Sequence, residues 1–93
     1  KNILKEVGQL RCKATGRKVT VLSSQPAAVL YTGNWLAGGC PKTKSDKYYQ
    51  DYAGVAIECQ GFSDAVNHPD FPSIYLKADE LYCNKIVFKL EQF

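Results

Sequence analysis

The chain contains no methionine, and its 93 residues include one histidine and one tryptophan. Because it begins at Lys1 and not at a methionine, we expect it to be a processed or internal piece of a longer polypeptide. No apolar run approaches the roughly 18 residues that a membrane-spanning helix requires, which argues against a membrane partner. The first residues also lack the apolar region and small-residue cleavage site of a signal peptide.

The chain also has no large excess of charge of one sign. Twelve Lys and Arg residues against nine Asp and Glu residues give a net charge of +3, and the basic residues are scattered along the chain. A nucleic-acid surface requires basic residues gathered in a patch or stripe. We therefore expect no nucleic-acid partner.

The four cysteines contain no C-x-x-C pair, since they stand at Cys12, Cys40, Cys59 and Cys83. This spacing argues against a zinc site, and we expect no metal. The number of cysteines still allows two disulfides, as in a secreted protein. We favour free thiols because Cys12 and Cys59 occupy apolar strand positions, where a reduced cysteine packs as a small hydrophobic residue.

Alternating apolar and polar residues are frequent and predict strands. We expect the first two strands to form a hairpin that bends at Thr15-Gly16. We expect six strands and no amphipathic helix, with the strands over 10–14, 18–25, 27–32, 54–60, 74–78 and 82–92. The fold class is therefore all-β and mostly antiparallel, and the length allows one domain over residues 1–93.

The strand over 54–60 has two unlike faces, because side chains alternate along a strand. One face is apolar, and the other combines small residues with Glu58 and Gln60. Small residues beside a carboxylate and an amide leave room for a polar ligand. Taken alone, however, a glutamate in a strand is most often simply solvent-facing.

Three motifs stand in order along the chain. Gln25-Pro26 followed by Tyr31-Thr32-Gly33-Asn34 reads Q-P-x-x-x-x-Y-T-G-N, residues 54–60 read G-x-x-x-E-x-Q, and residues 64–72 read D-A-x-N-x-P-x-F-P. These motifs resemble those of the aldose 1-epimerase (galactose mutarotase) family, and the resemblance runs from Leu10 to the C-terminus with consistent spacing.

The resemblance implies that residues 1–93 are the C-terminal portion of a single mutarotase-like β-supersandwich domain. It implies a cytoplasmic isomerase of carbohydrate metabolism that interconverts the α and β anomers of aldohexoses such as galactose and glucose. No cofactor is implied. The implied partner is the remaining N-terminal part of the fold, in the same polypeptide or as a separate chain.

The resemblance also assigns roles to individual residues. Glu58 matches the family's general base, which takes the proton of the anomeric C1 hydroxyl so that the sugar ring opens. Gln25 matches a residue that hydrogen-bonds sugar hydroxyls, for which an amide can both donate and accept. Further residues expected to line the site are Tyr31, Asn34, Trp35 and Gln60.

The chain also departs from the family pattern. The histidine acid, a second histidine, and a sugar-binding Asp and Arg belong to the part of the fold outside this chain, and His68 does not stand at the catalytic position. Ala27 and Ala37 replace a usual Gly and a common Asp. We therefore expect the isolated chain to be inactive. The alternative is a mutarotase-like protein that binds carbohydrate, or has a structural role, without turnover.

Overall fold

The computed structural model describes residues 3–39 and 42–93. These residues divide into two compact units, of which one contains 3–28 with 59–93 and the other contains the described part of 29–58. In chain order the elements are β1 (Lys5–Cys12), β2 (Arg17–Ser23), β3 (Ala27–Tyr31), α1 (Leu36–Gly39), β4 (Ala56–Gln60), the 3-10 turn η1 (Ala65–Asn67) and β5 (Ile86–Gln92).

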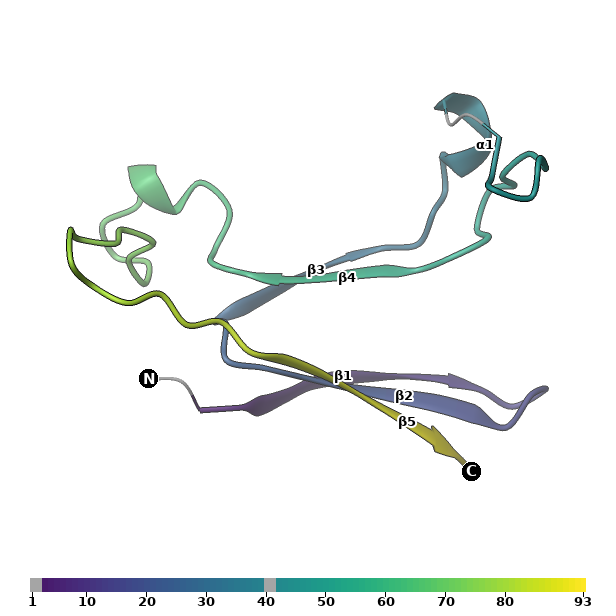
Figure 1. Ribbon diagram of the computed structural model, residues 1–93, viewed down its shortest axis with the longest axis horizontal. Coiled ribbons are helices and arrows are strands. Elements are labelled where there is room, and N and C mark those ends of the chain that lie inside the picture. The colour runs from purple at the N-terminus through teal and green to yellow at the C-terminus, as the bar shows by residue number, and fades with distance from the viewer. Residues whose placement is uncertain (1–2, 40–41) are drawn as a thin grey trace. The chain divides into compact units, whose positions relative to one another are not determined.

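Strands β1, β2 and β5 form an antiparallel sheet in the order β1-β2-β5 (Figure 1). The predicted hairpin between β1 and β2 is confirmed, although β1 begins earlier than expected and ends at Cys12. The backbone N–H of Gly16 donates to the Cys12 carbonyl at 2.9 Å. Gly16 has a φ of 68°, a left-handed conformation that suits glycine and closes the turn.

The buried residues of this sheet lie on its central strand. Val21 is fully buried, and Thr20 and Ser23 are nearly so, because β2 has a strand on each side. The register pairs Val21 with Phe88 and Val19 with Leu90. Phe88 and Leu90 are nevertheless 57% and 79% exposed, so the described residues leave this apolar face of β5 largely uncovered.

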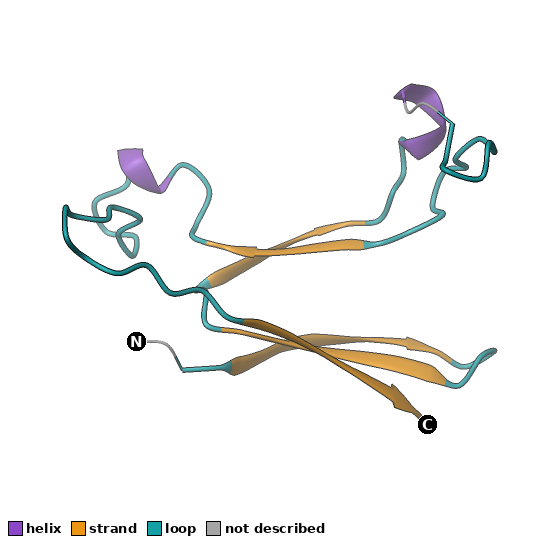
Figure 2. Ribbon diagram, in the orientation of Figure 1, coloured by secondary structure: helices purple, strands orange, loops and turns teal. Residues whose placement is uncertain are grey.

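Strands β3 and β4 form a separate two-stranded sheet, as the strand colouring shows (Figure 2). Strand β4 begins at Ala56, two positions later than predicted, and Val55 is exposed. Ile57 and Cys59 are half-buried whereas Glu58 is exposed, as the predicted alternation requires.

Two strand predictions were wrong. Residues 74–78 form no strand, and β5 begins at Ile86 instead of position 82. In residues 74–78, nearby side chains accept hydrogen bonds from the backbone N–H groups that would otherwise pair with a neighbouring strand. The Tyr75 N–H donates to Ser73 Oγ at 3.1 Å, and the Lys77 N–H donates to Glu80 Oε1 at 2.8 Å. The molecule is still all-β, since its helical segments are single turns.

Cys12, Cys59 and Cys83 are free thiols in the structure, as favoured from the sequence, and Cys40 lies outside the described residues. Cys12 is exposed, so its predicted packing as a small hydrophobic residue was wrong. Over residues 3–39 and 42–93, no helix has the length and apolarity to cross a membrane. No cluster of metal-ligating side chains occurs within those ranges either.

Candidate functional site

Gln25 directly follows strand β2, and the end of that strand fixes its backbone. Its N–H donates to Ser23 Oγ at 2.9 Å. The next residue back, Ser24, is tied to the segment before β5: the Ser24 N–H donates to the Lys85 carbonyl at 3.1 Å, and the Lys85 N–H donates to Ser24 Oγ at 3.0 Å. These bonds continue the β2–β5 pairing one step beyond Ser23 and Ile86.

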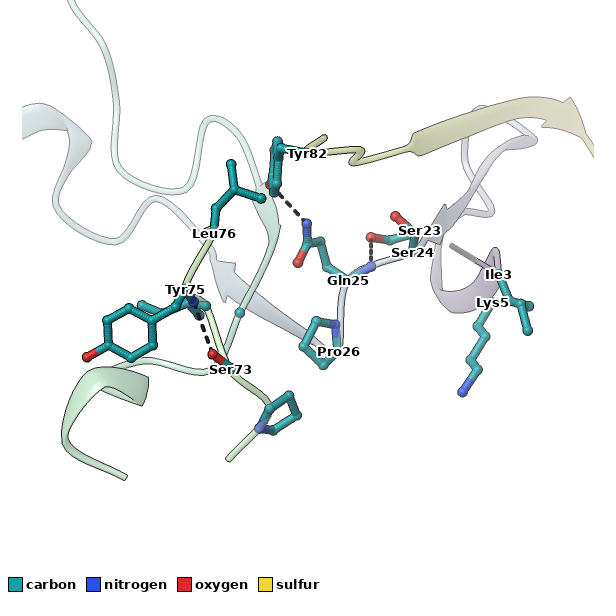
Figure 3. Close-up of a pocket in the computed structure, with 13 residues that line it drawn as sticks. Ile3, Lys5, Ser23, Ser24, Gln25, Pro26, Ser73, Tyr75, Leu76 and Tyr82 are labelled. Atoms are coloured by element: carbon teal, nitrogen blue, oxygen red, sulfur yellow. Dashed lines mark hydrogen bonds between the residues drawn. The ribbon is translucent and has the colours of Figure 1, made fainter. Parts of the chain in front are cut away.

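The Gln25 side chain projects into a hollow of about 780 Å³ within its own unit (Figure 3). Its amide nitrogen donates to the Tyr82 hydroxyl at 3.2 Å, a bond between residues far apart in the sequence. Lys5, Ser23, Ser24 and Tyr75 are among the other residues that line the hollow. The hollow has the size of a small-molecule site and is lined by both polar and apolar residues.

Glu58 lies in strand β4 between Ile57 and Cys59, which are half-buried. Strand alternation places Ala56 and Gln60 on the same side of β4 as Glu58, and Gln60 is half-buried. Glu58 takes part in none of the ion pairs of the described residues, which are Lys18–Glu91, Lys42–Asp46 and Asp64–His68. Its carboxylate is therefore accessible and not committed to a partner within the described chain.

Tyr31, Asn34 and Trp35 lie together at the end of strand β3. The Trp35 N–H donates to the Tyr31 hydroxyl at 3.2 Å, and the Trp35 side chain is 79% exposed. Asn34 and Trp35 line a hollow of about 340 Å³ with Asp51. Asp51 also accepts the Ala37 N–H at 2.9 Å and so holds the short helix α1 (Leu36–Gly39) in place.

The predicted site residues are distributed between the two units. Gln25 and Gln60 belong to one unit, whereas Glu58 belongs to the other with Tyr31, Asn34 and Trp35. Within each unit the structure adds a residue that sequence reasoning missed, namely Tyr82 beside Gln25 and Asp51 beside Asn34. No local signal marks either residue, because the contacts join segments separated along the chain.

His68 is held by its own loop, as expected for a histidine outside the catalytic position. Its Nε2 lies 3.2 Å from the Asp64 carboxylate, and its ring stacks on Phe71 with 4.7 Å between the ring centroids. Phe71 also packs against Phe62 at 5.1 Å. This segment is therefore held by aromatic and polar contacts and not by a sheet.

These features define the class as an all-β protein with antiparallel strand pairing. The family model described as "Aldose 1-epimerase" matches residues 1–89. The chain belongs to the aldose 1-epimerase family, as its three motifs indicated.

Several curated proteins are similar to the chain. It is 42% identical to the galactose mutarotase of Rattus norvegicus and 40% identical to that of Homo sapiens, over 82% of this chain and 22% of each of those proteins. It is 32% identical to the aldose 1-epimerase of Escherichia coli, over 78% of this chain and 25% of that protein. The chain therefore spans about a fifth to a quarter of these relatives. No solved structure gives a significant match.

Proposed function

We propose that this chain is the C-terminal portion of an aldose 1-epimerase, in which Glu58 is the general base for interconversion of aldohexose anomers. The observation that carries the proposal is that the Glu58 side chain is exposed, and unpaired among the described residues, in a chain that belongs to this family. It is an exposed carboxylate on a strand, without an ion pair among the described residues, at the position that matches the family's base. A base must be accessible to the proton that it removes.

The proposed reaction begins when the Glu58 carboxylate takes the proton of the C1 hydroxyl. The C1–O5 bond then breaks, its electron pair stays on O5, and O5 takes a proton from a general acid. The sugar is now an open-chain aldehyde, which turns about the C1–C2 bond. Ring closure on the other face, with both proton transfers reversed, gives the other anomer.

The general acid belongs to residues outside this chain. The chain's only histidine is His68, which is paired with Asp64 and stacked on Phe71. By the resemblance, a histidine of the N-terminal part supplies the acid. Loss of one general acid typically costs about 10²–10⁴-fold in rate, so the isolated chain should be inactive.

The sugar contacts are proposed for the polar groups that remain accessible. Gln25 lies at the edge of a hollow, and its amide can bond to hydroxyls as donor and acceptor. Trp35 offers an exposed ring on which the C–H face of a sugar can stack, with Tyr31, Asn34 and Gln60 as further lining. Galactose and glucose are the proposed substrates, and the cytoplasm is the proposed location.

Residues 1–93 are thus proposed as one part of a single mutarotase-like domain that the N-terminal part completes. The apolar side chains exposed on the three-stranded sheet support this. Ile86, Phe88 and Leu90 are 41%, 57% and 79% exposed and alternate along β5 (Ile86–Gln92), so they share one face. A face of this kind is normally packed against another layer.

The test is polarimetry on the full-length protein that carries this sequence, with freshly dissolved α-galactose and α-glucose. The wild-type protein should accelerate the change in optical rotation. Glu58→Gln should reduce the catalysed rate by about 10²–10⁴-fold, because the amide is nearly isosteric with the carboxylate but cannot take the proton.

Glu6→Gln is the matched control, since Glu6 is an exposed glutamate of strand β1 (Lys5–Cys12). This control should keep the wild-type rate. Full activity in Glu58→Gln would remove Glu58 from the mechanism. Galactose binding by the wild-type protein without any acceleration would assign the chain to a carbohydrate-binding protein instead.

A further inference from the structure

We infer that Tyr82 is a positioning residue for the sugar-binding amide of Gln25. The inference deepens the proposed function and rests on it for the role of Gln25. The observation is the 3.2 Å hydrogen bond from Gln25 Nε2 to the Tyr82 hydroxyl, at the rim of the hollow shown in Figure 3.

The Gln25 amide requires such a partner. The last torsion of a glutamine side chain is broad and nearly two-fold, so an unrestrained amide presents its oxygen and its nitrogen almost equally. The Tyr82 hydroxyl accepts from Nε2 and thereby limits rotation of the amide about this torsion. With the amide held in this way, its oxygen and its second N–H are left as one acceptor and one donor for sugar hydroxyls.

The backbone around both residues supports this geometry. Ser23 Oγ fixes the Gln25 N–H, and the paired bonds between Ser24 and Lys85 hold the segment before β5 beside the end of β2. Tyr82 lies three positions before Lys85, so this extension of the sheet brings its ring to Gln25. Tyr82 is 65% exposed, so a ligand at the hollow can reach it.

The experiment measures galactose binding and turnover for full-length wild-type protein, Tyr82→Phe, Gln25→Ala and the double variant. Tyr82→Phe should weaken galactose binding by about 3–10-fold, the usual value of one hydrogen bond. The KM should rise by a similar factor with kcat unchanged, because an oriented amide binds the ground state and the transition state alike. In the Gln25→Ala background the same change should have no further effect, because the group that it orients is gone.

Tyr48→Phe is the control, since Tyr48 is an exposed tyrosine outside the proposed site and should keep wild-type binding. Loss of affinity in Tyr82→Phe that persists in the Gln25→Ala background would overturn the inference, as would unchanged affinity or a fall in kcat alone. A wild-type protein that binds galactose without interconverting its anomers overturns the proposed function, while the binding data still decide the role of Tyr82. Absence of galactose binding overturns both.

Discussion

At the scale of single residues, the ionisation of the Cys12 thiol depends most on its neighbour Thr15. The side chain and the backbone of Thr15 hydrogen-bond to Cys12, and these bonds hold the pKa of the Cys12 thiol below its ordinary value. Cys12 lies at the end of β1 and is exposed, so reagents can reach it. A lowered pKa means that the reactive thiolate is present at a lower pH.

We therefore predict that Thr15→Val shifts the pH profile of Cys12 alkylation to higher pH. The variant keeps the branched side chain but loses the hydroxyl that stabilises the thiolate. Alkylation rates of the Cys12 peptide, measured by mass spectrometry after digestion across pH, test this. Cys83 is the internal control and should give the same profile in both proteins, whereas an unchanged Cys12 profile would show that Thr15 has no such effect.

Residue-scale predictions from the sequence succeeded where one motif carried the information. The alternation around Glu58 correctly gave an exposed carboxylate between half-buried neighbours. The hydrogen bond from Gln25 to Tyr82 could not be predicted, because it joins side chains 57 residues apart. Whether Glu58 and Gln25 serve one site is still a prediction.

At the scale of the elements, the segment between β3 and α1 depends on Gly33. Gly33 has a φ of 75°, and its carbonyl accepts the N–H groups of Leu36 at 3.2 Å and Tyr52 at 2.8 Å. A Cβ atom at this position would lie 2.8 Å from the Gly54 carbonyl oxygen and 2.8 Å from Leu36 Cδ1. A side chain there would be strained both by conformation and by lack of space.

Gly33→Ala should accordingly lower the free energy of unfolding of the full-length protein by about 1–3 kcal/mol, the usual cost of such backbone strain. Denaturant titration followed by circular dichroism measures it. Gly8→Ala is the matched control, because a Cβ at Gly8 would meet nothing within 4 Å. Equal stability of the two variants would contradict this account of Gly33.

The strands were predicted well where turn residues bounded them and poorly elsewhere. The hairpin was predictable because Gly16 closes it and the alternation is regular on both sides. The alternation over 74–78 was equally regular, yet Ser73 and Glu80 divert its backbone donors into local bonds. Such competition depends on side-chain geometry, which periodicity does not report.

At the scale of the whole molecule, little apolar surface is buried within the described residues. Val21 is their one fully buried apolar side chain, while many large apolar residues are exposed. Burying a valine contributes about 1.5–3 kcal/mol, whereas ordering the backbone costs about 1–2 kcal/mol for each residue. Composition alone could not show this, because an ordinary apolar content does not say where the apolar side chains lie.

We predict that purified residues 1–93 unfold without a cooperative transition. We also predict that they bind a hydrophobic dye such as ANS. The uncovered face of β5, with Phe88 and Leu90, is the physical reason. Thermal melts at high dilution, followed by circular dichroism, are the measurement. The full-length protein is the control and should melt cooperatively without dye binding, while a sharp melt of the isolated chain would contradict the prediction.

The most direct test of the central claim is anomer exchange measured by NMR magnetisation transfer on saturating galactose. The full-length wild-type protein should exchange the α and β anomeric proton signals far faster than buffer does. Glu58→Gln should still bind galactose but exchange the signals at the uncatalysed rate. Exchange at the wild-type rate in Glu58→Gln would contradict the claim that this chain supplies the base.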